Sequence, residues 1–190
     1  MLHKVVQLGG KSYFWLEKTN VVSMIQEYQV SGFRVREYEE LGSTNTETER
    51  VGWNELEDKM VILTYRQTQG RGQVGNHWES EPGKNISMTV VFKPRELPAG
   101  QQFAVSMVIA LGACDFISRY VSGCSVKWPN DIYVGDRKIS GILIEHSIMG
   151  RYVGGSLCGI GVNINQEQFL SDAPNPVSLF QLLGRELPLQ

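Results

Sequence analysis

The sequence predicts an α+β (mixed α/β) domain in which a central mixed β-sheet is covered by helices on one face. Strand-like segments cluster in the second half of the chain, and helix-like segments separate the earlier strands. At 190 residues the chain has the length of one domain, which buries roughly 70% of its unfolded surface. Its 42% hydrophobic and 20% charged composition is ordinary for a globular protein.

The first part of the chain carries the weakest pattern. Residues 4–8 and 12–16 are expected to flank a turn at Gly9 and Gly10, and residues 21–28 to form a short helix. We therefore treat residues 1–32 as an N-terminal segment of unknown role.

The pattern sharpens at Phe33. Residues 33–38 alternate like a half-buried strand. Ser43, Thr44 and Asn45 are typical N-cap residues and predict a helix that runs to about Glu57. Residues 60–65 form a second expected strand, and the polar, glycine-rich stretch 67–84 reads as a long loop of the kind that is often functional.

The later part of the chain is expected to contain a cluster of strands. Residues 85–92 predict a third strand, and apolar spacing predicts a helix over residues 101–121. Three consecutive strands and a short helix are then expected at residues 126–134, 138–146, 152–165 and 177–183. Gly135 and Asp136 form the turn of the first hairpin in this series.

Composition excludes several classes of protein. The formal net charge of -2, from 18 basic and 20 acidic side chains, argues against a broad nucleic-acid surface. We find no apolar run near the roughly 18 residues of a membrane span and no secretion signal in the first ten residues. Three cysteines without a CxxC pair predict free thiols in the cytoplasm, and three histidines without ligand spacing predict no structural zinc.

A glycine-rich loop is the first candidate for chemistry. Gly70, Gly72 and Gly75 let backbone N–H groups approach an anion, Arg71 adds a charge-assisted hydrogen bond, and Trp78 offers a surface for a planar base. The same pattern fits an ordinary surface loop, and it matches neither a Walker loop nor a dinucleotide fingerprint.

Two lysines form the second candidate. Lys127 and Lys138 are expected on facing strands of one hairpin, where an anion would relieve their repulsion, and Asp131 between them is suited to Mg²⁺. The alternative is that both lysines cover a sheet edge. Pro129, which a central strand would not accept, favours a distorted site over a plain scaffold.

Two further segments are ambiguous. Gly159 and Gly161 allow a flat group to lie on their strand, and Asn163 could read an adenine edge or cap a turn. Ser43, Thr44 and Asn45 could bind a neutral polar ligand or cap their helix. No Ser, His and Asp arrangement of a hydrolase is present in the sequence, so no protein nucleophile is expected.

Together these segments, from about Phe33 to the end, resemble biotin protein ligase, also called biotin–[acetyl-CoA-carboxylase] ligase. The matching residues are Ser43-Thr-Asn45, Gln67, Gly70-Arg-Gly72, Trp78, Lys127-Trp-Pro-Asn-Asp131, Arg137-Lys-Ile-Ser-Gly-Ile-Leu-Ile-Glu145 and Gly159-Ile-Gly-Val-Asn163. The resemblance implies a class II synthetase-like core over residues 33–190. It implies ATP, Mg²⁺ and biotin as ligands.

The resemblance also implies roles for individual residues. Lys138, Lys127 and Arg71 would be catalytic, and Asp131 would help to place Mg²⁺. The biotin-binding residues would be Ser43, Thr44, Asn45, Gln67, Gly70, Arg71, Gly72, Gln73, Lys138 and Gly141. The nucleotide-binding residues would be Trp78, Lys127, Asn130 and Asn163.

The implied reaction forms biotinyl-5'-AMP and transfers biotin to a lysine of a biotin carboxyl carrier domain. Gln73 and Val74 replace two arginines common in this family, so the intermediate is expected to be held less tightly. Neither an N-terminal helix-turn-helix nor the small C-terminal β-barrel is expected, so no DNA partner is implied, and a homodimer is compatible. A lipoate or octanoate ligase and a truncated, non-catalytic remnant that binds biotin or the carrier are the alternatives.

Overall fold

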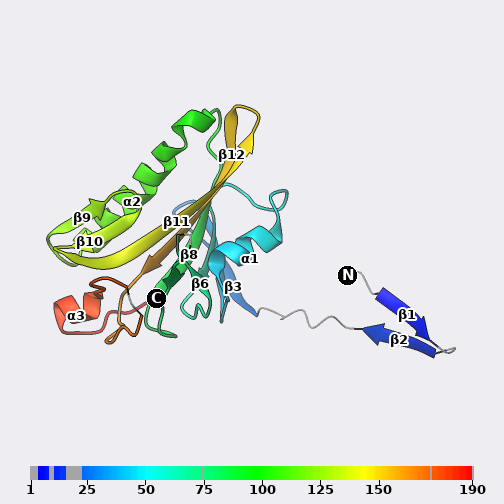
Figure 1. The fold of residues 1–190 in the computed structure, drawn as a ribbon, viewed down its shortest axis with the longest axis horizontal. Helices are drawn as coiled ribbons and strands as arrows, with labels where there is room; N and C mark the ends of the chain where they lie inside the picture. The colour runs from blue at the N-terminus through cyan, green and yellow to red at the C-terminus, as the bar shows by residue number, and fades with distance from the viewer. Residues whose placement is uncertain (1–3, 9–10, 16–22, 74, 172, 190) are drawn as a thin grey trace.

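An eight-stranded mixed sheet forms the centre of the molecule (Figure 1). The computed structural model describes residues 4–8, 11–15, 23–73, 75–171 and 173–189. The strand order is β3-β4-β5-β8-β12-β11-β10-β9, and of these neighbours only β4 and β5 are parallel. The bounds are β3 Met24–Val30, β4 Phe33–Tyr38, β5 Met60–Thr64, β8 Ile86–Phe92, β9 Cys124–Lys127, β10 Asp131–Val134, β11 Arg137–Met149 and β12 Tyr152–Val162. The predicted α+β class with a central mixed sheet is confirmed.

Two small hairpins accompany the main sheet. Strands β1 (Lys4–Leu8) and β2 (Lys11–Trp15) pair antiparallel close to where strands were expected, and the predicted turn at residues 9–10 lies outside the described residues. Within the glycine-rich loop, β6 (Gly70–Arg71) pairs with β7 (His77–Trp78). The loop therefore folds back on itself as a short hairpin.

The helix expected over residues 21–28 is wrong. Residues 24–28 of this stretch belong to β3, which pairs antiparallel with β4. Ser31 and Gly32 join the two strands with φ of 48° and 81°, the two positive values of a tight hairpin turn. This turn favours a strand pair over the helix that the side-chain pattern suggested.

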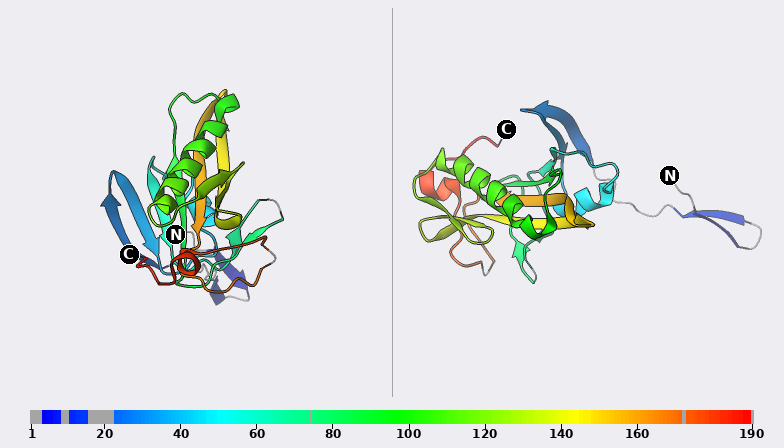
Figure 2. Two further views of the ribbon diagram at one scale, coloured as in Figure 1. Left: turned by 90° about the vertical axis from the view of Figure 1, so that its left-hand side faces the viewer. Right: turned by 90° about the horizontal axis from the view of Figure 1, so that it is seen from above.

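Helices lie on both faces of the sheet, so the expectation of one covered face is wrong. α1 (Thr44–Val51) packs near Val91 and Leu157, whereas α2 (Phe103–Ser118) packs near Ile160. Residues 157 and 160 of one strand point to opposite faces because side chains alternate. Both faces of the central strands carry buried apolar side chains, so both need cover. Figure 2 shows α2 running along the sheet in two further views.

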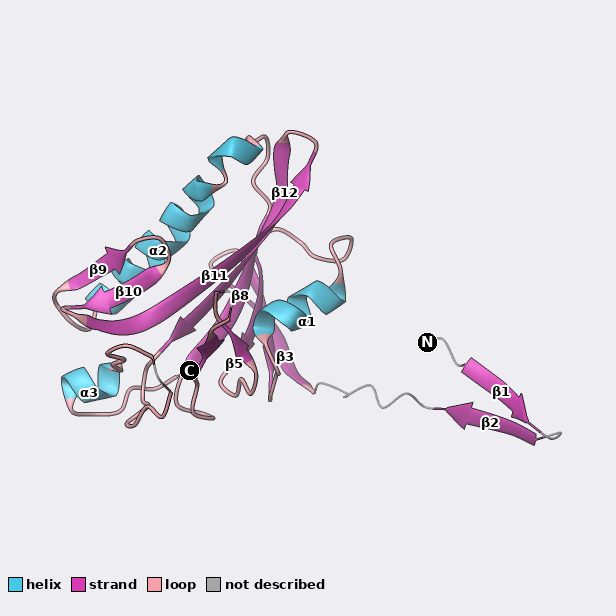
Figure 3. Cartoon of the chain, in the orientation of Figure 1, coloured by secondary structure: helices cyan, strands magenta, loops and turns pink. Residues whose placement is uncertain are grey.

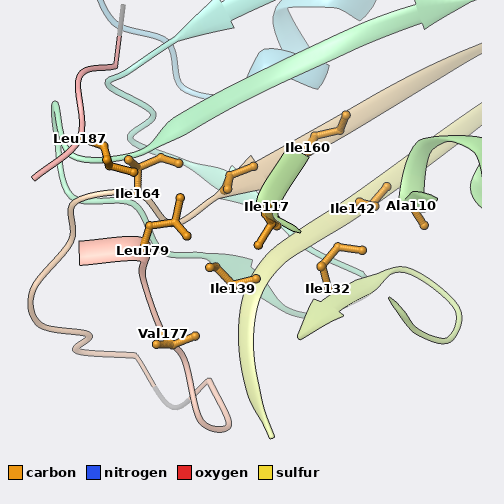
Figure 4. Packing of buried hydrophobic residues seen from close by; sticks show 11 residues of the cluster. Ala110, Ile117, Ile132, Ile139, Ile142, Ile160, Ile164, Val177, Leu179 and Leu187 are labelled. Carbon is orange, nitrogen blue, oxygen red and sulfur yellow. The ribbon is translucent and has the colours of Figure 1, made fainter. Parts of the chain in front are cut away.

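The core beside α2 is built from aliphatic side chains of the central strands and the C-terminal segment. Figure 4 shows them converging from β10, β11, β12 and α2. The buried members of this cluster are Ala110, Ile117, Ile132, Ile139, Ile142, Ile160, Val162, Ile164, Val177, Leu179 and Leu187. The C-terminal segment, which includes α3 (Leu179–Leu183, Figure 3), is thus part of the domain.

Several predicted boundaries move inward. α1 ends at Val51 instead of Glu57 because Gly52, with φ of 84°, terminates it. α3 begins after Ser178, which forms a capping box with Gln181.

The segment that contains α2 contradicts the expectation that no apolar run is long enough to span a membrane. Residues 99–118 are long and apolar enough to cross a membrane by length and composition alone, and 17% of the 18-residue apolar window within them is buried.

The lysine hairpin differs from the prediction. Residues 126–134 do not form one strand, because β9 ends at Lys127 and β10 begins at Asp131. Lys127 pairs with Asp131, and Lys138 pairs with Tyr133, so β10 lies between the two lysines. The intervening Trp128–Pro129 bond is cis, and proline supplies no N–H for a ladder. The chain turns here instead of continuing as a strand.

Candidate active site

A cavity of about 590 Å³ lies on the sheet face that carries α1. Its size is that of a small-molecule site. The start of α1, the glycine-rich loop and strands β10 to β12 enclose it. The predicted site residues that line it are Ser43, Thr44, Asn45, Gln67, Arg71, Gly72, Gln73, Trp78, Asn130, Asp131, Lys138 and Gly141. Segments far apart in sequence therefore meet in one cavity.

One end of the cavity carries a network of neutral polar groups. Gln67 Oε1 accepts a hydrogen bond from the Thr44 amide at 2.9 Å. Thr89 Oγ1 lies 2.8 Å from Thr44 Oγ1 and donates to Asn45 Oδ1 at 2.6 Å. Ser43 is the N-cap residue, yet its side chain makes no capping hydrogen bond within the described structure. Ser43 lines the cavity, so its hydroxyl is available to a ligand there.

Glu145 extends this network to the glycine-rich loop. Its carboxylate accepts from Asn45 Nδ2 at 2.7 Å and pairs with Arg71 Nη2 at 2.5 Å. Arg71 also pairs with Glu49 at 3.4 Å. Burial alone would lower the pKa of Arg71, but the charge and hydrogen bonds of Glu145 and Glu49 raise it. The guanidinium stays charged and holds the loop against α1 and β11.

The other end of the cavity is charged. Lys138 Nζ lies 2.7 Å from Asp131 Oδ1, and both side chains are about a quarter exposed, at 23% and 24%. The same ammonium lies 5.9 Å from the centre of the Trp78 ring. A cation, a carboxylate and an aromatic surface thus face the same space.

Trp78 lies flat on two strand glycines. A Cβ atom added to Gly141 would come within 2.8 Å of the indole, and one added to Gly161 would also clash with it. A Cβ added to Gly159 would clash with the amide of Asn45. The expectation that these glycines let a flat group approach β12 is confirmed. In this structure the flat groups are the chain's own side chains.

Three predicted site residues do not line the cavity. Lys127 Nζ lies 3.2 Å from Tyr133 Oη and 4.6 Å from its ring centre. Asn163 is buried and donates to the Val177 carbonyl at 3.1 Å, while its Oδ1 has no partner among the described residues. Gly70 packs against the Trp78 carbonyl, which leaves no room for a side chain. Their predicted roles stay predictions.

Two polar residues of the site were missed from the sequence. Thr89 is a fully buried hydroxyl residue between Met88 and Val90 of β8, and Glu145 follows the apolar run Ile142 to Ile144 of β11. A polar residue interrupting an apolar strand was the available signal. Whether such a polar residue belongs to the site depends on which face of the sheet its side chain occupies, and the sequence does not give that face.

The residues present fit Mg²⁺ only together with a phosphate ligand. Among the described lining residues, Asp131 is the sole acid. Within the described parts of the chain, no group of three His, Cys, Asp or Glu could hold a metal ion. Mg²⁺ commonly takes one or two carboxylates plus substrate phosphates, so a single aspartate is compatible with Mg²⁺ that arrives on a nucleotide. The three cysteines are free, as expected.

Comparison of the fold defines the class of protein. The structure is similar to that of biotin protein ligase from Aquifex aeolicus in complex with biotin and ATP, with a TM-score of 0.66 and 26% identity. The match covers 81% of this chain and 62% of that one. The domain is therefore an α+β, class II synthetase-like ligase core.

The family follows from the sequence match. The Biotin/lipoate A/B protein ligase family matches residues 38–163, about two thirds of the chain, and the chain belongs to this family. The residue span contains the start of α1, the glycine-rich loop and the strands that line the cavity.

Two relatives are informative. The chain is 26% identical to the bifunctional ligase/repressor BirA of Bacillus subtilis, over 97% of this chain and 59% of that protein. It is 32% identical to the biotin–[acetyl-CoA-carboxylase] ligase of Paracoccus denitrificans, over 64% of this chain and 51% of that protein. The chain thus spans between half and two thirds of the length of these relatives.

Proposed function

We propose that this chain is the catalytic core of a biotin protein ligase. It activates biotin with ATP as biotinyl-5'-AMP and transfers biotin to a lysine of a biotin carboxyl carrier domain. One observation carries this proposal. A single cavity has the neutral network of Thr44, Asn45 and Gln67 at one end and the Lys138–Asp131 pair at the other.

The two ends suit the two ends of biotin. The ureido head is neutral and needs hydrogen-bond donors and acceptors, which the Ser43, Thr44 and Gln67 groups offer. The carboxylate tail needs a cation, and Lys138 lies where the tail would meet a nucleotide beside Trp78. Gly141, which has no side chain, lets Trp78 pack against β11 between the two ends.

Adenylation follows from this placement. A carboxylate oxygen of biotin attacks the α-phosphorus of ATP, and the bond to pyrophosphate breaks. Because both reactants are anions, Lys138 must offset their repulsion and the charge that grows in the transition state. Arg71, held over the cavity by Glu145, adds a second positive charge. Asp131 is the residue that would hold Mg²⁺ arriving with ATP, and the bound ion would neutralise phosphate charge.

Transfer needs no nucleophile from this chain. The amine of an acceptor lysine attacks the carbonyl of the mixed anhydride and AMP leaves. The carrier domain is the expected partner, and the free thiols of Cys114, Cys124 and Cys158 fit a reducing cytoplasm. The formal net charge of -2 gives no broad basic surface of the kind that binds nucleic acid.

The test is biotin-dependent pyrophosphate release, followed by mass spectrometry of a carboxyl carrier domain after incubation with Mg-ATP. We expect release with biotin and one added biotinyl group on the carrier. Release with lipoate or octanoate in place of biotin would identify the other branch of the family. Biotin binding without release would identify a non-catalytic remnant, and either result would overturn the proposal.

A further inference from the structure

Glu79 gathers hydrogen-bond donors from a loop that is distant in sequence. It directly follows β7, which carries Trp78. Its carboxylate accepts from the Leu170 amide at 2.9 Å, the Ser171 amide at 2.8 Å and Gln166 Nε2 at 2.9 Å. A carboxylate that accepts several N–H groups binds them more strongly than a neutral acceptor would.

Gln166 ties this cluster to the sheet. Its side chain is 1% exposed, and its Oε1 accepts from the Glu81 amide at 3.1 Å and from Asn85 Nδ2 at 2.5 Å. Asn85 is itself fully buried beside the start of β8. The hydrogen bonds of Gln166 therefore connect the Glu79 cluster to buried residues of the core.

The far end of the same loop is fixed by the strand that carries Lys138. The Lys138 amide donates to the Asn175 carbonyl at 2.8 Å, and the Val177 amide donates to the Lys138 carbonyl at 2.9 Å. Ser171, which Glu79 anchors, and Ala173 and Pro174, which lie between the two anchors, line the cavity. The position of this wall depends on the anchors at both ends.

We propose that Glu79 is a positioning residue that sets the wall formed by Ser171, Ala173 and Pro174 at the Lys138 end of the cavity. This inference rests on the proposed function, because that end is where the nucleotide is expected to bind. Glu79 does not line the cavity and acts through the loop amides. Its loss therefore weakens nucleotide binding and leaves the polar end of the cavity unchanged.

The ionisation of Glu79 supports the same reading. Burial alone would raise the pKa of its carboxyl group, but hydrogen bonds from Ser171, Leu170 and Gln166 more than offset that effect and lower the pKa. The carboxylate is thus the form that the loop favours.

The experiment compares Glu79→Ala, Glu79→Gln and Glu79→Asp with Glu81→Gln as the matched control. The Glu81 side chain is exposed and makes no hydrogen bond within the described residues, so its loss changes charge alone. The Kd for Mg-ATP is measured by calorimetry, and KM for ATP and for biotin by pyrophosphate release. We expect Glu79→Ala to raise the Kd and KM for ATP about tenfold and to change KM for biotin less than about twofold.

The graded variants separate positioning from general destabilisation. Asp keeps two acceptor oxygens, whereas Gln keeps one and replaces the other with an NH₂ group that cannot accept from the loop N–H groups. We therefore expect Glu79→Asp to recover ATP affinity better than Glu79→Gln. Equal losses for ATP and biotin, or equal recovery by both variants, would contradict the proposal.

Hydrogen exchange gives a readout that needs no catalysis. The amides of Leu170 and Ser171 should be protected in the wild type and in Glu81→Gln, and should exchange faster in Glu79→Ala. Unchanged exchange would sink the inference. If the wild type binds ATP but releases no pyrophosphate with biotin, the proposed function fails while Kd and exchange still decide the role of Glu79. A wild type that binds no ATP defeats both.

Discussion

Lys138 and Asp131 form an ion pair of 2.7 Å although neither residue faces the other in the strand register. Lys138 pairs with Tyr133, and Asp131 pairs with Gly141. The register shifts between Ile132 and Tyr133, and this β-bulge turns the side chains of the two strands toward each other. The irregularity places a cation and a carboxylate together at the end of the cavity beside Trp78.

Replacing Lys138 with alanine should slow adenylation. The variant removes the ammonium from the place where carboxylate and phosphate would meet, so we expect the rate of biotin-dependent pyrophosphate release to fall about 10²–10³-fold or more. Lys84→Ala is the matched control, because Lys84 pairs with Glu186 at the surface, away from the cavity. If the rate of Lys138→Ala stays within a few fold of the Lys84→Ala rate, the proposed role of Lys138 in adenylation is wrong.

Thr89→Val should destabilise the polar end of the cavity. The Thr89 hydroxyl is fully buried and bonded to Thr44 and Asn45, so its removal leaves buried polar groups unpaired. We expect a loss of about 1–3 kcal/mol in the free energy of unfolding and weaker binding of biotin. Urea denaturation and a biotin titration measure the two effects.

Ser87 supplies the control for that variant. It occupies the same face of β8, is 2% exposed, and its hydroxyl has no hydrogen-bond partner among the described residues. Ser87→Ala should therefore be neutral or stabilising. A Thr89→Val protein as stable as Ser87→Ala would show that the network contributes nothing.

Gly141→Ala should collide with Trp78. Its new methyl group would lie within 2.8 Å of the indole, so we expect a destabilisation of about 1–3 kcal/mol. Gly112→Ala in α2 meets nothing within 4 Å and should stabilise the helix by about 0.5–1 kcal/mol. Adding Trp78→Ala to Gly141→Ala should recover part of the loss. Additive effects in this double-mutant cycle would mean that the two residues do not touch.

The contribution of Glu79 to stability should depend on pH. Its pKa is lowered from the ordinary value of 4.5 in the folded protein, so the stabilisation is complete above that value and is lost as the pH falls through the lowered pKa. The difference in urea midpoint between wild type and Glu79→Gln should therefore be largest at neutral pH and shrink as the pH falls below 4.5 and through the lowered pKa. A difference that stays constant across this range would show that ionised Glu79 does not stabilise the fold.

Residues far apart in sequence were correctly expected to lie together. Arg71 and Lys138 were assigned to one site from their own motifs, whereas Ser43 and Gln67 were added through the family resemblance, and all four line the cavity. The class of fold was also predicted, because alternation and helical spacing are properties of short windows of sequence.

The errors occurred where local pattern and tertiary pairing disagree. Residues 24–30 were expected in a helix, yet the turn at Ser31 and Gly32 pairs them with β4. Lys127 was placed opposite Lys138, but a turn after Lys127 inserts β10 between them. The side-chain pattern of a segment does not show which strand the segment pairs with, so these two pairings could not be predicted from the sequence.

Sequence alone grouped the candidate site residues, because the motifs that contain Arg71, Lys138 and Gly161 are specific in combination, although each also fits a purely structural role. Only the tertiary structure decided which groups touch. The ion pair of Lys138 with Asp131, the bridge from Asn45 through Glu145 to Arg71, and the anchoring of a distant loop by Glu79 join residues of separate segments. Contacts of this kind depend on strand register and on the face that each side chain occupies, and both are set by the packing of the whole sheet.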